Sequence, residues 1–271
     1  MKSDRSANAD TSARVRALRY GVRAPALLGL VLIAVPLGVV VSLLPDGTHD
    51  PLREPLSQRI VRLWSQALLR GVFGFRIRRH GAPVRGPVLF VANHVSWMDI
   101  QLLHTQRAAC FVAKAEIARW PLIGWLATCA GTIFHQRGHA ASLNSVMAVM
   151  VQRLREARPV AVFPEGGIEH AAEGIARVRT FHARVFQCAL DAQVPIQPVA
   201  LTYRRGNDLY DDASFRPGET FLGNFLRLLG SAPITAEVHF LSPLTIPAES
   251  GRRAFAEAAR AAIATCLEQR P

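Results

Sequence analysis

The residues best suited to catalysis are His94 and Asp99, which lie five positions apart in the segment Asn93–Asp99. An apolar run, Pro87–Ala92, precedes them and predicts a buried strand. Apolar residues that follow predict a short helix with Ser96 as its N-cap. His94 therefore falls where a strand ends and a helix begins, at the edge of the sheet where α/β proteins place their chemistry.

This spacing favours a histidine base held by a carboxylate. On one continuous helix, five residues correspond to about 500° of rotation, so the two side chains would not share a face. Across a turn into a helix, Asp99 can fold back and accept a hydrogen bond from one nitrogen of His94, which leaves the other nitrogen free as a base. The alternative is a loop histidine with satisfied hydrogen bonds beside a helix-capping aspartate.

The elements that must position this pair alternate from Pro87 onward. We expect strands at 87–92, 109–113, 131–135, 159–163, 194–203 and 235–241. We expect helices at 98–103, 116–130 with a break at Pro121, 142–156, 181–192 and 253–267, and a polar loop at 206–218. Pro195 and Pro198 suit the start or the edge of their strand and predict a structural role there. This alternation predicts an α/β fold, with a mostly parallel sheet flanked by helices.

Composition narrows the function classes. The 271 residues are 50% hydrophobic and carry a formal net charge of +12, a combination that favours an anionic membrane surface over nucleic acid. Aromatic residues make up only 7% and do not alternate with basic residues, which also argues against nucleic acid. The four cysteines are far apart, which suits a reducing compartment and gives no sign of a zinc site or a disulfide framework.

The N-terminal part predicts a membrane anchor. Residues 1–23 form a basic tail, and the uncharged stretch Ala24–Leu44 is long enough to cross the hydrocarbon. A signal peptide is the alternative, but the end of the stretch lacks the small residues of a cleavage site. Residues 56–75 predict an amphipathic helix at the membrane interface or, alternatively, a surface helix on the core. We therefore expect a tail (1–23), an anchoring segment (24–80) and a catalytic domain (81–271).

Two further segments carry groups that bind substrates. In Gly131–Arg137, the arginine just past a strand can grip a phosphate or carboxylate, although a solvated surface arginine is the alternative. In Phe163–Gly167, the glycines allow backbone N–H groups to approach a ligand, and Glu165 can accept hydrogen bonds from hydroxyls. A plain turn is the alternative there.

Taken in order, four motifs resemble those of one family. They are Asn-His-x-Ser-x-x-Asp, Gly-x-x-Phe-x-x-Arg, Phe-Pro-Glu-Gly and Val-Pro-x-x-Pro-Val, and they span residues 87–203. The chain thereby resembles the glycerolipid acyltransferase family, most closely the 1-acylglycerol-3-phosphate (lysophosphatidic acid) acyltransferases. The resemblance implies that His94 is the general base, Asp99 its orienting partner, and Arg137 the ligand of the acceptor's phosphate.

The resemblance implies two further assignments. Glu165 with Gly166 would hold the glycerol end of the acceptor, and Lys114 lies where the family commonly has a lysine near the catalytic residues. Lys2 and Lys114 are the only lysines in a chain that otherwise uses arginine, although a solvated lysine is the alternative. The chain departs from the family where Thr-Arg usually follows Glu-Gly, since it has Gly167 and Ile168 there.

Two more departures fall on substrate-contacting motifs. Gln136 replaces the usual aspartate before the arginine of the second motif, and Phe181–Arg184 replaces a more common Phe-Lys-x-Gly. The catalytic pair is unchanged. These differences leave the acceptor open.

The expected function is therefore a membrane-associated O-acyltransferase. It would move a fatty acyl group from acyl-CoA or acyl carrier protein to a lysophospholipid, most simply 1-acylglycerol-3-phosphate, with membrane lipids as partners. Another lysolipid, such as lyso-ornithine lipid, is the alternative acceptor. A non-catalytic lipid-binding protein and a metal-dependent hydrolase with His94 and Asp99 as ligands are rivals from other classes. We expect no cofactor besides the acyl donor, and no metal.

The expected membrane topology follows from the compartment in which the acyl donor is found. Both donors are cytoplasmic, so the active site is expected on the cytoplasmic side of the inner membrane. Arginines 14, 16, 19 and 23 also favour a cytoplasmic N-terminus. A single straight crossing would place the N-terminus and the active site on opposite sides of the membrane. A second crossing by residues 56–75 would bury three arginines, each at a cost of about 2.5–3.5 kcal/mol. We therefore expect Ala24–Leu44 to enter one leaflet and return, with Pro36 near the bend, while 56–75 lies along the surface.

Overall fold

The computed structural model describes residues 2–43, 54–136, 140–168, 178–206, 208–245 and 247–269. Within these ranges, one sheet has the strand order β1-β8-β6-β2-β5-β3-β4, and β7 pairs with the end of β6. Neighbours from β6 to β4 run parallel, whereas β8 runs antiparallel to β6 and parallel to β1. The mostly parallel sheet of the predicted α/β fold is confirmed.

The expected strands match the observed ones closely. The strands are β1 Arg76–His80, β2 Leu89–Ala92, β3 Cys110–Lys114, β4 Ile133–His135, β5 Val160–Val162, β6 Ile196–Arg205, β7 Asp208–Leu209 and β8 Thr235–Phe240. Parallel strands that share a direction bring their carboxyl ends to one edge. The segments after β2 and β5 therefore meet, and these segments hold His94 and Glu165.

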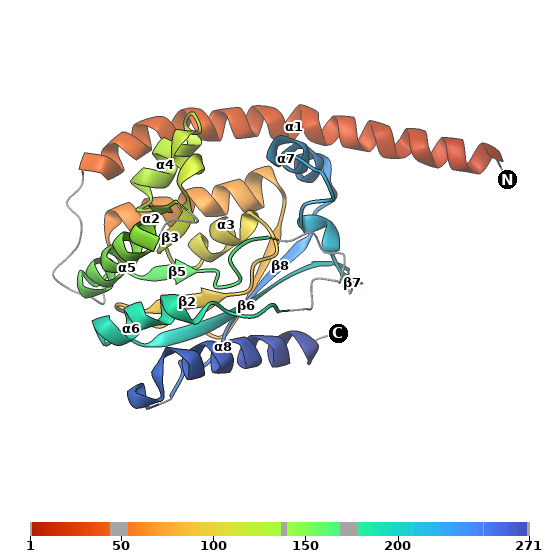
Figure 1. Cartoon of the computed structure of the whole chain (residues 1–271). Helices are drawn as coiled ribbons and strands as arrows, with labels where there is room; N and C mark the ends of the chain where they lie inside the picture. The colour runs from red at the N-terminus through yellow and green to blue at the C-terminus, as the bar shows by residue number, and fades with distance from the viewer. Residues whose placement is uncertain are drawn as a thin grey trace.

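Helices cover both faces of this sheet (Figure 1). They are α1 Lys2–Leu43, α2 Leu56–Gln66, α3 Met98–His104, α4 Ile123–Cys129, α5 Ala140–Arg155, α6 Gln187–Ala192, α7 Phe221–Gly230 and α8 Gly251–Glu268. Shorter 3-10 turns span Ala115–Arg119, Ala183–Phe186, Asp211–Ala213 and Ala248–Ser250, and Ala67–Val72 is a π-helix. In β2, Phe90 and Ala92 face one core with α3 and α7, whereas Leu89 and Val91 face the other with α5, α6 and α8.

The N-terminal helix α1 lies along the domain instead of returning through a bend. It is continuous through Pro25 and Pro36, so the expected return at Pro36 is wrong. A proline removes one hydrogen bond of the helical ladder, and the packing of a helix can offset that loss. Here Ala34 is buried and the ring of Trp125 lies directly over Gly38, which fixes the second half of α1 against the domain.

Two of the four arginines that suggested the membrane topology, Arg19 and Arg23, join α1 to α7. Arg23 donates through Nη1 to the carbonyl oxygens of Leu229 and Ser231, at 2.7 and 2.8 Å, and Arg19 donates to Gly230 at 3.2 Å. These carbonyls end a helix and lack partners within it, so two cations there satisfy them. Burial and the neighbouring Arg19 lower the pKa of Arg23. The helix α1 runs without a break across the boundary that we expected between the tail (1–23) and the anchoring segment (24–80).

Two other expectations need correction. Residues 76–80, the end of the expected anchoring segment (24–80), form β1 at the edge of the sheet, because pairing with β8 satisfies their backbone. The 56–75 segment is an α-helix only to Gln66, after which the π-helix buries Leu68, Leu69 and Val72 in the core. Its first turns leave Leu56 and Leu63 exposed.

Of the two prolines expected at the start or the edge of their strand, only Pro198 differs from the expectation. Pro195 precedes the strand and Pro198 is its third residue, but β6 is an internal strand with partners on both sides. Pro198 still contributes its carbonyl, which accepts from the N–H of Leu241 at 3.0 Å. The lack of an N–H at one position does not exclude a proline from an internal strand near its start.

Candidate active site

His94 and Asp99 meet at the carboxyl edge of the sheet. His94 follows β2, Asp99 lies in the first turn of α3, and His94 Nδ1 is 2.9 Å from Asp99 Oδ2. The predicted fold-back is therefore confirmed. The His94 side chain is 14% exposed, while that of Asp99 is fully buried. With Nδ1 on the carboxylate, Nε2 is the nitrogen left for a substrate.

Asp99 also holds the turn itself. Its Oδ2 accepts from the N–H groups of Val95 and Ser96 at 2.7 and 2.9 Å. The helix α3 begins at Met98 with Trp97 as its N-cap, one residue later than the N-cap that the sequence suggests, while the Ser96 hydroxyl accepts a long hydrogen bond of 3.4 Å from the Met98 N–H. One carboxylate thus contacts the imidazole and also accepts hydrogen bonds from the turn that carries it, so the capping interpretation of Asp99 does not exclude the orienting one.

Tyr203 completes the environment of Asp99. Its hydroxyl donates to Asp99 Oδ1 at 2.6 Å from the neighbouring strand β6. Burial and the nearby carboxylate raise the pKa of Tyr203 well above its usual value, so it remains a donor. The sequence interpretation missed this residue, since a tyrosine at the end of an apolar strand gives little signal.

Glu165 contacts the backbone of His94. Its Oε1 accepts from the His94 N–H at 3.1 Å, and the imidazole stacks on Phe163 with ring centroids 3.9 Å apart. The segment after β5 therefore fixes both the backbone and the ring of His94. This is a positioning contact that the resemblance did not imply.

Arg179 is the second residue that the sequence interpretation missed. Its Nε lies 3.3 Å from Glu165 Oε2, and its Nη2 donates to the carbonyl oxygen of Gly167. Burial raises the pKa of Glu165, while the His94 amide and Arg179 act in the opposite direction. Gly166 has a φ of +81°, which favours glycine, and a Cβ there would lie 3.1 Å from His182 Nε2.

The other predicted site residues have different outcomes. Lys114 ends β3 with an exposed side chain, and within the described ranges no hydrogen bond joins it to His94 or Glu165. Arg137 lies outside the described residues. Two of the expected substrate ligands, Glu165 and Gly166, therefore lie beside His94 and Asp99.

The oxyanion that develops during acyl transfer needs hydrogen-bond donors, and backbone N–H groups often supply them. The N–H groups of His94, Val95 and Ser96 all donate to carboxylates, so this geometry does not leave them for a substrate. Asp99 is equally engaged, because donors occupy both of its oxygens. That engagement disfavours a hydrolase that would use Asp99 as a metal ligand.

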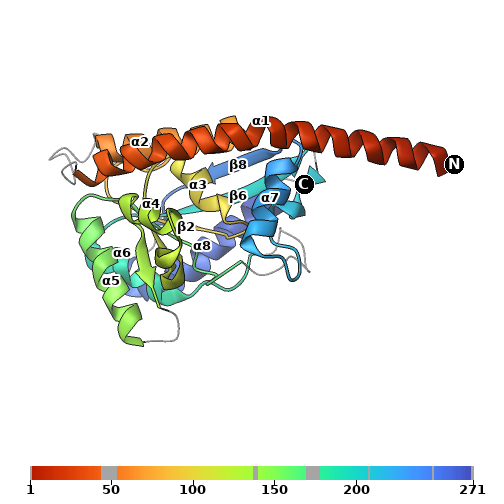
Figure 2. The same ribbon diagram turned by 90° about the horizontal axis from the view of Figure 1, so that it is seen from above.

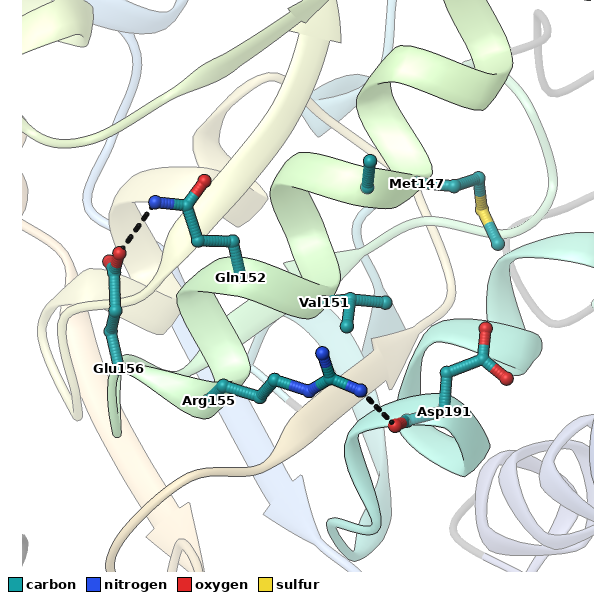
Figure 3. Close-up of a pocket in the computed structure, with 7 residues that line it drawn as sticks. Met147, Val151, Gln152, Arg155, Glu156 and Asp191 are labelled. Atoms are coloured by element: carbon teal, nitrogen blue, oxygen red, sulfur yellow. Dashed lines mark hydrogen bonds between the residues drawn. The ribbon is translucent and has the colours of Figure 1, made fainter.

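A surface hollow of about 710 Å³ lies elsewhere (Figure 3). It is formed by the last turns of α5 and α6, which lead into β5 and β6, so it is at the edge opposite His94. Its polar side chains pair locally, since Arg155 donates to the Asp191 carbonyl oxygen and Gln152 to Glu156. This hollow is not part of the histidine site.

Comparison with known proteins agrees with this geometry. Residues 76–202 match the model of the family described as Acyltransferase. Lyso-ornithine lipid O-acyltransferase of Pseudomonas aeruginosa is 38% identical over 230 residues, which cover 84% of this chain and 85% of that protein. This chain belongs to the acyltransferase family. It is an enzyme of the lysolipid acyltransferase type.

Other relatives of this acyltransferase carry two different names. Lyso-ornithine lipid O-acyltransferase of Rhodobacter capsulatus is 29% identical over 93% of this chain and 91% of its own. 1-Acyl-sn-glycerol-3-phosphate acyltransferase of Neisseria gonorrhoeae is 31% identical over 54% of this chain and 56% of its own. The crystal structure of the 1-acyl-sn-glycerophosphate (LPA) acyltransferase PlsC from Thermotoga maritima shares the fold, with a TM-score of 0.65 at 17% identity over 96% and 95% of the two chains.

Proposed function

We propose that this acyltransferase transfers a fatty acyl group from a thioester donor to the hydroxyl of an amino-acid-headed lysolipid of the lyso-ornithine type. The observation that carries the acyl-transfer step is the 2.9 Å contact between His94 Nδ1 and the buried Asp99. The donor is acyl-CoA or acyl carrier protein, and no further cofactor is invoked.

In the proposed mechanism, neutral His94 acts as the general base. An aliphatic hydroxyl has a pKa far above 7, so its proton must leave as the oxygen attacks the thioester carbonyl. Nε2 accepts that proton while Asp99 stabilises the imidazolium and holds its orientation. The tetrahedral adduct then collapses with cleavage of the C–S bond, and the imidazolium returns the proton to the leaving thiolate. In this mechanism Lys114 is the proposed hydrogen-bond donor to the oxyanion of the tetrahedral adduct.

The choice of acceptor rests on the relatives and on one motif. The lyso-ornithine lipid acyltransferases of Pseudomonas aeruginosa and Rhodobacter capsulatus align over 84% and 93% of this chain, whereas the Neisseria gonorrhoeae enzyme named for the phosphate acceptor aligns over 54%. Gly167 and Ile168 also replace the Thr-Arg that the resemblance to the glycerolipid acyltransferases leads one to expect. These observations favour the alternative acceptor over 1-acylglycerol-3-phosphate, which becomes the second candidate.

A direct assay separates the two acceptors. Purified protein is incubated with one acyl donor and a panel that contains lyso-ornithine lipid, 1-acylglycerol-3-phosphate and other lysophospholipids, and the products are identified by mass spectrometry. We expect kcat/KM to be highest for lyso-ornithine lipid. Exclusive acylation of 1-acylglycerol-3-phosphate would reject the proposed acceptor, and no acylation of any lysolipid would reject the proposed reaction.

The exposed apolar surface around α1 supports attachment of the protein to one leaflet of the membrane. Within the described part of α1, Ala13–Leu43 is long and apolar enough to cross a membrane. It nevertheless lies across the domain, with its N-terminal end projecting beyond (Figure 2). Exposed apolar side chains continue from α1 onto the neighbouring α4 segment and α7, namely Leu28, Leu32, Ile33, Val39, Trp120, Ile123, Leu222 and Leu226.

We accordingly propose that α1 lies in the plane of the cytoplasmic leaflet of the inner membrane, with the active site on the cytoplasmic side. Arg19 and Arg23 hold α1 against α7. A straight crossing of the membrane by α1 would break these contacts, so they oppose it. Single cysteines at Ser3, Asp46 and the exposed Arg260 should all resist an impermeant thiol reagent added from the outer face. Labelling at Asp46 alone would show that the chain crosses twice.

A further inference from the structure

Trp97 connects the turn before Asp99 to the helix α7. It is the N-cap of α3 and comes two residues before this aspartate. Its half-buried indole donates through Nε1 to Asn224 Oδ1 at 2.9 Å. The indole also contacts the rings of Phe221 and Phe225, with centroids 5.3 and 5.7 Å away. Positions 221, 224 and 225 share one face of a helix, so that face of α7 holds the tryptophan.

The amide of Asn224 is held in one orientation. Its side chain is fully buried, and Nδ2 donates to the Ser214 carbonyl oxygen at 2.9 Å and to Glu219 Oε2 at 3.0 Å. Hydrogen bonds from Arg227 lower the pKa of Glu219 to about 2, so this carboxylate remains an acceptor. A rotated amide would turn Nδ2 toward the indole N–H and Oδ1 toward two acceptors. The network therefore keeps Oδ1 directed at Trp97.

This hydrogen bond defines the position of the indole more narrowly than the ring contacts do. Aromatic rings attract each other over centroid distances of about 4.5–7 Å, whereas a hydrogen bond weakens steeply as it departs from its preferred length and angle. Asn224 cannot follow a displaced indole, because its amide is tied to Ser214 and Glu219. The place of Trp97 against α7 therefore depends on Asn224.

We propose that Asn224 is a positioning residue for acyl transfer that acts through Trp97, an assignment that rests on the general-base mechanism proposed above. Backbone N–H groups of the same turn donate to Asp99 Oδ2, which contacts His94 Nδ1 at 2.9 Å. Loss of the indole contact would displace this turn, and with it the base relative to the substrate hydroxyl. Such misplacement lowers kcat and leaves substrate affinity unchanged, because neither Asn224 nor Trp97 is assigned a contact with the substrate.

The test removes each partner of the hydrogen bond alone and then both together. Trp97→Phe keeps an aromatic ring and loses only the N–H donor, while Asn224→Ala loses the acceptor. The control is Gln197→Ala, since the buried Gln197 amide also makes three hydrogen bonds, all with backbone groups, from the start of β6. Steady-state kinetics use the lysolipid that the wild type acylates best, at a temperature well below the Tm of each variant.

We expect Trp97→Phe to lower kcat about three- to tenfold and Asn224→Ala about tenfold, with the KM values of donor and acceptor within about twofold of the wild type. The double variant should be no slower than the slower single variant, because both changes break one contact. Gln197→Ala should lower Tm and keep kcat within about twofold.

Three results would overturn this role of Asn224. They are a wild-type kcat in Trp97→Phe, a rise in KM with kcat unchanged, and losses that multiply in the double variant. Trp97→Phe decides the question if Asn224→Ala does not fold. Failure of the underlying mechanism is recognised separately, because His94→Ala would then retain turnover. Failure of the proposed reaction is also distinct, because the wild type would then acylate no lysolipid.

Discussion

Two histidine–carboxylate pairs in this acyltransferase differ in what they can do. His94 and Asp99 lie at the carboxyl edge of the sheet, with Nδ1 2.9 Å from the carboxylate. His239 and Glu237 lie within β8, with Nε2 3.5 Å from the carboxylate, and point to the face of the sheet opposite Val238. In the second pair the imidazole is only 3% exposed.

The surroundings of the two carboxylates explain the difference. Asp99 receives backbone N–H groups and the Tyr203 hydroxyl, all of which fix its orientation toward one imidazole. Glu237 instead lies among cations, with Arg78 at 3.6 Å and Arg204 at 3.7 Å. Proximity of a histidine to a carboxylate therefore does not define a catalytic base. The base also needs directed contacts and one ring nitrogen that a substrate can reach.

The largest contrast should come from removing each histidine. His94→Ala should lower kcat by about a thousandfold or more, because no other group takes the proton, while its Tm shifts little. His239→Ala should leave kcat near the wild-type value and lower the stability by roughly 2 kcal/mol, since a fully packed ring stacked on His80 is lost. Steady-state assays and thermal melting measure both, and substantial turnover by His94→Ala would contradict the mechanism.

Substitution of the two carboxylates should show the same contrast between catalysis and stability. Asp99→Asn should lower kcat by about 10³–10⁴, since the amide cannot stabilise the imidazolium. Glu237→Gln should keep kcat within about twofold and lower stability by roughly 3 kcal/mol, because Arg204 is largely buried and loses its counter-charge. A fall in kcat with Glu237→Gln, at temperatures where the variant is folded, would place the second pair in catalysis.

The sequence predicted the first pair because its signal is local. His94 and Asp99 are joined by one turn, and the strand before them is strongly apolar, so spacing alone suggested the contact. The parallel sheet followed in the same way from alternating segments. Tyr203 and Arg179 were missed because their contacts, with Asp99 and Glu165, depend on how β6 and the 178–182 segment pack. Tertiary packing sets these contacts, and the pattern of residues along the sequence does not reveal them.

The N-terminal part shows the same limit. Composition predicted an apolar helix correctly, yet it assigned Arg19 and Arg23 to topology when they bind the carbonyls at the end of α7. Likewise, β1 was overlooked because five residues that include three arginines look like a tail until β8 pairs with them. The partners of charged residues are the part that a single sequence leaves open.

Neighbouring residues of β6 allow a finer comparison, because they point to opposite faces of the sheet. Tyr203→Phe should lower kcat about three- to tenfold and stability by about 1 kcal/mol, since Asp99 loses one of its donors. Thr202 lies opposite Glu237, and its buried hydroxyl has no hydrogen-bond partner in the described part of the chain. Thr202→Val should leave kcat unchanged and raise stability by up to about 1 kcal/mol. A Tyr203→Phe variant with full activity would show that the remaining donors suffice.

The smallest effect should come from metal ions. His80, Glu237 and His239 offer ligand atoms within 4.8 Å of one another, which resembles a zinc site. The two rings, however, stack with centroids 4.3 Å apart and planes within 4°. Nitrogen lone pairs lie in the ring plane, so two parallel rings cannot aim them at one ion, and Arg78 and Arg204 add positive charge beside the carboxylate.

We therefore expect neither zinc nor a chelator to change the Tm of the wild type by more than about 1 °C, a shift that corresponds to less than about 0.5 kcal/mol for a chain of this size. His80→Ala is the matched control, because it removes one of the three ligands. A zinc-dependent rise in Tm that His80→Ala abolishes would mean that the rings rotate apart to bind the ion. His239 and Glu237 would then be metal ligands. They would differ from His94 and Asp99 in their chemical role as well as in their position in the sheet.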